Sequence, residues 1–199
     1  PADQTGNTFY FGTWNDGAYV YNFKTELCEN LKIKYQLPLI DKSYIHSITR
    51  ALDKIYIATD ISGLIVFNPQ SKSVHSKIFL ANEKILELKF DQNKILWIGT
   101  ANGLFKMDIL TEKIVKIEIL HPEFKNKDIS SIVRGIAIDN FKNAWITIGD
   151  DADRLPFLIK IEPQNQNMEF IQHNSDKKSF PITDEIRNVV IDSNGIVYI

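Results

Sequence analysis

Short apolar runs that alternate with polar residues recur along the chain, and glycines or polar turns separate them. Residues 93–108, NKILWIGTANGLFKMD, place an aromatic residue, a Gly-Thr pair and a second glycine between two apolar runs. Residues 7–22, NTFYFGTWNDGAYVYN, and residues 53–68, DKIYIATDISGLIVFN, have the same layout. Alternation with a period of two predicts β-strands, and the glycines predict tight turns between them.

The aromatic residue of this pattern recurs at a regular distance. It stands at Tyr10, Tyr56, Trp97, Trp145 and Tyr198, with separations of 46, 41, 48 and 53 residues. A period in the forties built from short strands is typical of β-propeller blades. We therefore expect the first four, Tyr10, Tyr56, Trp97 and Trp145, to pack one blade against the next rather than to bind a ligand.

Each repeat contains four strand-like runs, and the most polar of them comes last, as suits an exposed outer edge. The sequence predicts an all-β protein, a β-propeller made of four-stranded antiparallel blades. About four blades are present, as part of a larger propeller; a closed four-bladed ring is the alternative. The chain 1–199 is one propeller segment whose units span residues 1–43, 44–84, 85–131, 132–185 and the start of a fifth, 186–199.

Glycines and small residues occupy two equivalent places in the repeats. Gly12, Ala58 and Gly99 end the strand that holds the aromatic, which predicts close approach of a neighbouring blade. Three further glycines follow in the next turn and predict a backbone with positive φ: Gly17, Gly63 and Gly103.

Composition and charge narrow the classes of function that the sequence supports. The net charge is -2, which gives no electrostatic reason to expect nucleic acid or direct membrane contact. The four histidines are scattered, and no nucleotide-binding or hydrolase motif is present, so the sequence predicts neither a catalytic group nor a cofactor. The single cysteine, Cys28, is expected to be a partly buried packing residue. Three acidic residues form a weak metal candidate that we interpret as a solvated loop: Asp150, Asp151 and Asp153.

The first strands of the units converge on the propeller axis, so their polar residues are binding candidates. Their alignment places four residues at one equivalent position near the channel mouth: His46, Leu86, Arg134 and Arg187. The following position holds Ser47, Glu87, Gly135 and Asn188. Charges at this place need partners or water. Either Glu87 and nearby acids pair with the arginines, or the arginines face a wet channel open to a ligand.

Turns on the same face supply further candidates. Trp14, Asn15 and Asp16 follow the first Gly-Thr pair, Asp60 follows the second repeat's threonine, and Asp150 and Asp151 lie in the fourth unit. An exposed Trp beside amides and carboxylates suits an oligosaccharide or another small polar ligand, because the ring stacks on a sugar and the polar groups bind hydroxyls. The alternative is that Trp14 packs on the adjacent loop. Long loops at residues 121–131 and 174–185 border this face.

The quoted segments, together with LKFDQNKILWIGT (88–100) and IAIDNFKNAWIT (136–147), resemble the two-component regulator propeller repeat. The fourth unit departs from it, with Thr147-Ile148 in place of Gly-Thr. The resemblance implies a sensor region in the periplasm, as in hybrid two-component histidine kinases of Bacteroidetes, which recognises an oligosaccharide and relays the signal to a kinase elsewhere in the parent chain. Two alternatives stay open: a non-catalytic scaffold that forms a homodimer through propeller faces or edge strands, and a propeller lyase or lactonase.

Overall fold

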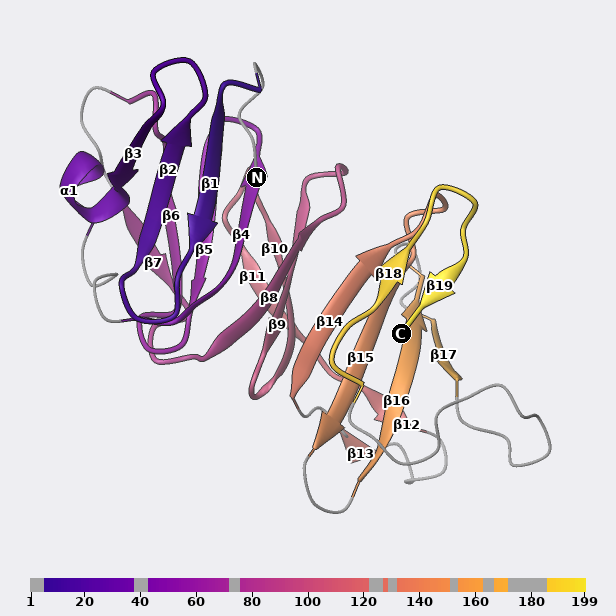
Figure 1. The fold of residues 1–199 in the computed structure, drawn as a ribbon. Helices are drawn as coiled ribbons and strands as arrows, with labels where there is room; N and C mark the ends of the chain where they lie inside the picture. Colours follow the sequence, from indigo (N-terminus) through magenta and orange to yellow (C-terminus); the bar gives the residue numbers. More distant parts are fainter. Residues whose placement is uncertain are drawn as a thin grey trace.

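The chain folds into a row of antiparallel β-sheets that follow an open arc (Figure 1). The computed structural model describes residues 6–37, 43–71, 76–121, 127–128, 132–150, 154–162, 167–171 and 186–199. Figure 1 shows the first sheet at one end of the arc and the last hairpin at the other. The predicted propeller fold is confirmed, whereas the two separated ends do not form the closed four-bladed ring.

Three four-stranded sheets form the middle of the arc, and the strands of each sheet follow the order of the chain. Blade 2 consists of β4 (Ile45–Ala51), β5 (Lys54–Thr59), β6 (Leu64–Phe67) and β7 (Lys77–Phe79). Blade 3 consists of β8 (Ile85–Phe90), β9 (Ile95–Thr100), β10 (Gly103–Asp108) and β11 (Ile114–Ile117). Blade 4 consists of β14 (Val133–Ile138), β15 (Ala144–Asp150), β16 (Arg154–Ile161) and β17 (Met168–Ile171).

Smaller sheets complete the described fold. Blade 1 consists of β1 (Thr8–Gly12), β2 (Ala18–Asn22) and β3 (Leu27–Asn30), and the short helix α1 (Leu31–Tyr35) follows it. A two-stranded hairpin of β12 (Leu120–His121) and β13 (Lys127–Asp128) lies between blades 3 and 4 in the sequence. The hairpin of β18 (Val190–Ile191) and β19 (Val197–Tyr198) begins blade 5.

The hydrophobic core is divided among the junctions between neighbouring blades. Each junction holds the repeated aromatic of one blade and apolar residues of the next: Tyr10 with Ile45 and Phe67, Tyr56 with Ile85 and Leu96, Trp97 with Val133 and Ile146, and Trp145 with Val189 and Val197. The predicted blade-to-blade packing of these four aromatics is confirmed. Burial of both faces of the sheet explains why β5 is apolar at four of its six positions and β6 at all four.

Two of the small residues allow this close packing, as the sequence predicts. A Cβ atom at Gly99 would lie 2.7 Å from the carbonyl oxygen of Val133 in the next blade, and one at Gly12 would lie 2.4 Å from Cγ2 of Ile45. The turn glycines also have the predicted backbone, since φ is 73° at Gly17, 75° at Gly63 and 119° at Gly103.

The threonine of each repeat stabilises the turn between the second and third strands. Thr59 Oγ1 donates to the carbonyl of Gly63 at 2.8 Å and accepts from the N–H of Ser62 at 2.8 Å. Thr13 and Thr100 make the equivalent pairs of hydrogen bonds. In blade 4 the threonine stands one position earlier in the repeat, and Thr147 Oγ1 accepts from the N–H of Gly135 at 2.9 Å. The threonine of blade 4 thus joins the first and second strands of the sheet and not the turn between the second and third.

The expected burial of Cys28 is wrong, and one helix was not expected from the sequence. Cys28 is exposed in β3 instead of partly buried, because its side chain lies on the polar outer strand of blade 1. Helix α1 was not expected; Asn30 begins it by accepting a hydrogen bond from the N–H of Lys32 at 2.9 Å, and Leu31 is fully buried. In the part of the chain that the structure describes, no helix is long and apolar enough to cross a membrane.

Candidate functional site

The first strands of blades 2, 3 and 4 each begin with an irregular pairing that sets apart one residue. The register shifts between Ile45 and Ser47, between Ile85 and Glu87, and between Val133 and Gly135. The residues left out of the pairing are His46, Leu86 and Arg134, so the predicted equivalence is confirmed for these three, while that of Arg187 stays a prediction. A bulge re-aims the side chain it carries. His46 is exposed and Arg134 half-buried, whereas Leu86 is buried.

The starts of these strands lie beside the turns between second and third strands, and we name this edge of the blades the loop face. The N–H of Ile45 donates to the carbonyl of Thr13 at 3.1 Å, which joins the first turn to the start of β4. Within blades 2 and 3, backbone hydrogen bonds link Asp60 to Tyr44 and Ala101 to Lys84 in the same way. The fold therefore brings the two groups of predicted site residues to one edge.

An aromatic pair occupies this edge between blades 1 and 2. The rings of Trp14 and Tyr44 have centroids 5.6 Å apart and planes tilted by 59°. Trp14 is 81% exposed, so contact with Tyr44 leaves most of its surface open to solvent. The predicted packing of Trp14 on an adjacent segment is confirmed, and the ring still presents an exposed face.

A carboxylate is fixed next to the pair. Asp60 Oδ1 accepts from the N–H of Tyr44 at 2.9 Å, so the position of the carboxylate is coupled to the residue that supports Trp14. Ile61, the next residue, is 63% exposed. Trp14, Tyr44 and Asp60 form what we name the aromatic site: an exposed ring, a supporting ring and a hydrogen-bond acceptor on two adjacent blades.

His46 follows the aromatic site along β4 and lies in a mixed electrostatic environment. Partial desolvation and the positive charges of Lys84 and Arg134 lower its pKa below the ordinary value, although Asp60 acts in the opposite direction. A neutral imidazole both donates and accepts hydrogen bonds. The charges of Asp60 and Arg134 thus both act on His46.

Asn15 and Asp16 are exposed in the same turn as Trp14, but Asp16 is directed to blade 1 itself. Its carboxylate accepts from the hydroxyl of Tyr19, and this contact raises the pKa of Tyr19. Its backbone carbonyl accepts from Nδ2 of Asn30 at 3.3 Å. These hydrogen bonds hold the turn that presents Trp14.

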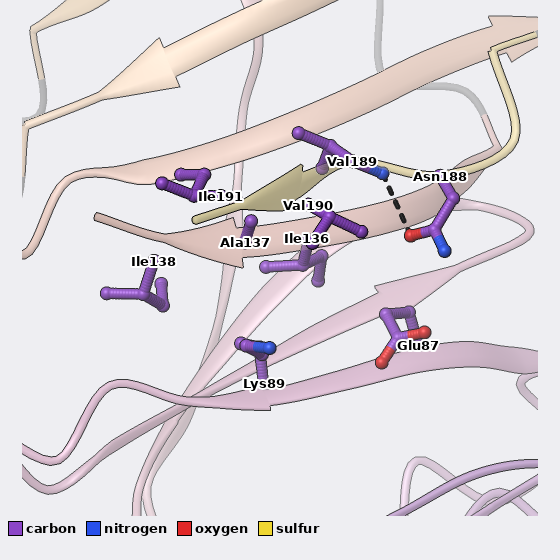
Figure 2. Close-up of a pocket in the computed structure, with 9 residues that line it drawn as sticks. All are labelled: Glu87, Lys89, Ile136, Ala137, Ile138, Asn188, Val189, Val190 and Ile191. Carbon is purple, nitrogen blue, oxygen red and sulfur yellow. Dashed lines mark hydrogen bonds between the residues drawn. The ribbon is translucent and has the colours of Figure 1, made fainter. Parts of the chain in front are cut away.

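A groove of about 240 Å³ lies between β8, β14 and β18 (Figure 2). Its walls are Glu87, Lys89, Ile136, Ala137, Ile138, Asn188, Val189, Val190 and Ile191. Figure 2 shows Glu87 and Lys89 on the same strand, with Asn188 opposite Glu87. Glu87 pairs with Ser47, whose hydroxyl donates to it at 3.0 Å, rather than with an arginine. Desolvation raises the pKa of Glu87, although hydrogen bonds from Ser47 and from the N–H of Leu88 act to lower it.

Other predicted residues contribute less. Arg187 is exposed in the segment before β18. Asp151 and Asp153 lie outside the described residues, and of Asp150 the structure gives the backbone pairing with Arg154. Most of the two long loops, 121–131 and 174–185, also lies outside them. Among the described residues, no group of three or more His, Cys, Asp or Glu side chains could hold a metal ion.

Sequence reasoning missed Tyr44 and Lys89. Tyr44 was assigned to a strand and so was not considered as a partner for Trp14. The signal was available, because Tyr44 directly precedes β4 and lies two residues before His46, and residues at a strand start share the loop face. Lys89 lies two residues after Glu87 and therefore on the same side of β8.

No protein-family model and no curated protein matches the chain. Several solved structures do match the chain. The extracellular domain of BT3049, described as a hybrid two-component system of B. thetaiotaomicron, matches 99% of this chain and 24% of its own with a TM-score of 0.74 and 20% identity. The extracellular domain of the hybrid two-component system BT4673 from the same organism matches 96% of this chain and 24% of its own, with a TM-score of 0.70 and 21% identity.

A third match comes from outside this group. The WD40 β-propeller domain of Doa1 has a TM-score of 0.64 and 12% identity over 96% of this chain and 56% of its own. This chain thus spans 24% of the length of the two bacterial proteins, which are extracellular domains of the class that the sequence resemblance indicates. The chain is a β-propeller segment with the fold found in these extracellular domains.

Proposed function

We propose that this chain is a ligand-binding segment of a sensor propeller that works in the periplasm, on the extracytoplasmic side of a two-component system. Two independent observations support the proposal. The repeats resemble the two-component regulator propeller, and the fold matches extracellular domains of hybrid two-component systems over 96–99% of this chain. The segment binds a ligand, and a histidine kinase elsewhere in the parent protein provides the catalytic output.

The observation that carries the proposal is the aromatic site. Trp14 is 81% exposed, is supported by Tyr44 at 5.6 Å, and lies near a carboxylate fixed by the same Tyr44. A sugar ring has an apolar face, which stacks on an indole, and hydroxyl groups, which donate to a carboxylate. We therefore assign an oligosaccharide to this site.

Polar residues around the aromatic site would extend the contact. Asn15 and Asp16 lie on one side in the Trp14 turn, and His46 lies on the other at the start of β4. An oligosaccharide longer than two sugars would continue from His46 toward Arg134 and Arg187, along the strand starts of blades 4 and 5. A ligand that contacts two or more blades can favour one arrangement of the blades over another.

The groove between β8, β14 and β18 is a weaker oligosaccharide candidate. None of the nine residues that line it is aromatic; six are aliphatic, and the others are Glu87, Lys89 and Asn188. Stacking on an aromatic is the apolar contribution that hydroxyl-rich ligands can use, since they have little other apolar surface. The aromatic site is thus favoured over the groove.

A thermal-shift screen against defined oligosaccharides tests the proposal, followed by calorimetric titration of each hit. A ligand at about 100 Kd stabilises the folded state by about 2.7 kcal/mol. Trp14→Ala and Tyr44→Ala are expected to abolish the shift, and Asp60→Asn is expected to weaken it. Phe141→Ala is the matched control, because Phe141 is 84% exposed in the turn between β14 and β15, at the opposite edge of its blade.

The proposal fails if hits bind the Trp14→Ala and Tyr44→Ala variants with unchanged affinity. It also fails if no oligosaccharide in a panel of plant, host and microbial glycans shifts the melting temperature of folded protein. Binding that survives both aromatic substitutions but is lost in Glu87→Gln would move the site to the groove.

A further inference from the structure

The turn between the second and third strands has the same hydrogen bonds in blades 1 and 2, at residues 13–17 and 59–63. In each turn the first residue is a threonine, whose Oγ1 donates to the carbonyl of the fifth residue and accepts from the N–H of the fourth. Ile61 therefore occupies the position that Asn15 holds in blade 1. Asparagine is a residue that turns favour, whereas isoleucine is not, so the geometry of the turn does not explain Ile61.

Three segments lie side by side on the loop face of blades 1 and 2: residues 13–14, 44–45 and 60–61. The N–H of Ile45 donates to the carbonyl of Thr13 at 3.1 Å. The N–H of Asp60 donates to the carbonyl of Tyr44 at 3.3 Å, and Asp60 Oδ1 accepts from the N–H of Tyr44 at 2.9 Å. These hydrogen bonds hold the segment of Ile61 beside the segment of Tyr44.

Each of these segments presents one exposed apolar side chain. Trp14 is 81% exposed, Tyr44 is 39% exposed and Ile61 is 63% exposed. A single exposed apolar residue is common on protein surfaces, but several on adjoining segments mark a binding surface. We name Trp14, Tyr44 and Ile61 the apolar ledge. It spans two blades that pack against each other and lies on the loop face, not on a side of a sheet that another blade would cover.

The two rings and Ile61 suit different parts of a sugar. Trp14 and Tyr44 can stack on the C–H face of a pyranose ring, which the common hexoses share. Ile61 is aliphatic and cannot hydrogen-bond, so a sugar hydroxyl placed against it loses water without gaining a partner. A methyl group of the sugar buries apolar surface there instead. Asn15 and Asp60, which adjoin the ledge in the sequence, can bind the remaining hydroxyl groups.

We propose that the oligosaccharide bound at the aromatic site contains a methyl-bearing sugar, and that Ile61 contacts its methyl group. Two kinds of sugar supply this group: a 6-deoxyhexose, in which a methyl replaces the hydroxymethyl group, and an N-acetylhexosamine, whose acetamido group ends in a methyl. The inference rests on the proposed function, because it adds a ligand feature to the same site. Ile61 is thus a specificity-determining residue, which discriminates between sugars that Trp14 and Tyr44 hold alike.

Three pairs of free sugars, matched except at the methyl group, test the inference by saturation-transfer difference NMR titration of the purified chain. L-Fucose is compared with L-galactose, L-rhamnose with L-mannose, and N-acetyl-D-glucosamine with N-formyl-D-glucosamine. In at least one pair the methyl-bearing sugar is expected to bind about tenfold more tightly, at the lower end of what one methylene contributes in an apolar pocket, because the ledge is open to solvent. The pair that discriminates identifies the source of the methyl group, whose protons should receive the largest share of the saturation.

Substitution of Ile61 tests whether this residue causes the preference. Ile61→Asn gives the turn of blade 2 the residue type that blade 1 already has at Asn15, so the fold is expected to tolerate it. This variant should bind both sugars of the discriminating pair with nearly equal affinity, whereas Ile61→Val should keep most of the preference. Ile33→Asn is the matched control, because Ile33 is 82% exposed on α1, outside the ledge, and this variant should discriminate as wild type does. Circular dichroism melts establish that each variant is folded.

Equal affinities within all three pairs, a methyl preference that persists in Ile61→Asn, or no binding of any of these sugars would each overturn the inference. The proposed function fails by a different result, namely oligosaccharide binding that survives Trp14→Ala and Tyr44→Ala. Oligosaccharide binding that is lost in those two variants, together with equal affinities within all three pairs, would retain the aromatic site and remove the methyl-bearing sugar alone.

Discussion

The hydroxyl of Ser47 donates to the carboxylate of Glu87 at 3.0 Å and thereby joins the first strands of blades 2 and 3. Both residues directly follow the bulge in their strand. The backbone N–H of Leu88 also donates to Glu87, at 3.0 Å. Glu87 is thus an acidic group held between blades, and burial raises its pKa.

Replacement of Glu87 should change how stability depends on pH. A carboxyl whose folded pKa is raised contributes stability below its ordinary pKa, and that contribution is lost as pH rises through the folded pKa. Glu87→Gln retains an oxygen acceptor and removes the charge. In urea denaturation, the free energy of unfolding of the variant is expected to rise relative to that of wild type as pH rises above about 4, because the wild-type carboxyl must then ionise in a buried place.

Lys116→Gln is the control for this comparison, since Lys116 is exposed on β11, the outer strand of the same blade. Its free energy of unfolding should differ from that of wild type by a nearly constant amount across the same pH range. A Glu87→Gln variant that loses stability relative to wild type as pH rises would contradict the assignment.

Asp139 should contribute to stability in the opposite pH direction. Its carboxylate accepts from the N–H groups of Phe141 and Asn143, from Asn143 Nδ2, and from Trp145 Nε1 at 3.0 Å. Burial acts to raise its pKa, but hydrogen bonds from Trp145 and Asn143 hold the pKa below its usual value. Asp139→Ala is expected to cost about 1–3 kcal/mol near neutral pH, with a loss that shrinks as acid protonates the wild-type carboxyl.

Asp192 offers a matched comparison for that substitution. It caps the equivalent turn through the N–H groups of Asn194 and Ile196, and its Oδ2 accepts from Tyr198 at a longer 3.3 Å. Because this hairpin is exposed, Asp192→Ala should cost clearly less than Asp139→Ala in chemical denaturation. Equal losses would mean that the Trp145 contact contributes nothing.

The repeated threonine should stabilise the turn between the second and third strands through its hydroxyl group. Thr59 is fully buried and both donates and accepts at 2.8 Å. Thr59→Val keeps the shape but leaves a buried carbonyl and a buried N–H without this partner, at a cost of about 1–3 kcal/mol. Thr59→Ser keeps the hydroxyl and should retain most of the difference in denaturation midpoint; a Ser variant as unstable as the Val variant would show that the hydroxyl is unimportant.

Much of this fold could be predicted from the sequence because the same apolar, aromatic and glycine positions recur in each repeat. The positions of Tyr10, Tyr56 and Trp97 fixed the blade period, and the glycines in the next turn predicted positive φ at Gly17, Gly63 and Gly103, which the structure has. The role of the repeated threonine was not predicted. Its hydrogen bonds depend on turn geometry that residue type alone does not reveal.

The candidate site was predicted less completely than the fold. Alignment of the first strands placed His46 and Arg134 at equivalent positions, and the bulges confirm this. Alignment could not show that Glu87 bonds to Ser47 or that Tyr44 supports Trp14. Both contacts join different blades, and their formation depends on the distance between sheets, which the period of one repeat does not determine.

Close packing between blades should make Gly99 intolerant of any side chain. A Cβ there would meet the backbone oxygen of Val133 at 2.7 Å and its Cγ1 at 2.9 Å, and backbone cannot move aside as a flexible side chain can. Gly99→Ala is expected to destabilise the chain by about 1–3 kcal/mol in thermal or urea denaturation. Ala58 holds the equivalent position in blade 2 and is fully buried; Ala58→Gly should be destabilising too, by about 0.5–1 kcal/mol. A Gly99→Ala variant as stable as wild type would show that blades 3 and 4 lie further apart.

The most direct test of the aromatic site is acrylamide quenching of tryptophan fluorescence during an oligosaccharide titration. The chain has three tryptophans, and Trp14 is 81% exposed whereas Trp97 is 4% exposed and Trp145 is half-buried. Most quenching in the unbound protein should therefore come from Trp14 and should disappear in Trp14→Ala. Saturating oligosaccharide is predicted to protect this fraction from acrylamide, with a midpoint equal to the Kd measured by calorimetry. Calorimetric binding with quenching of Trp14 unchanged would contradict the central claim, because the ligand would then lie elsewhere on the propeller.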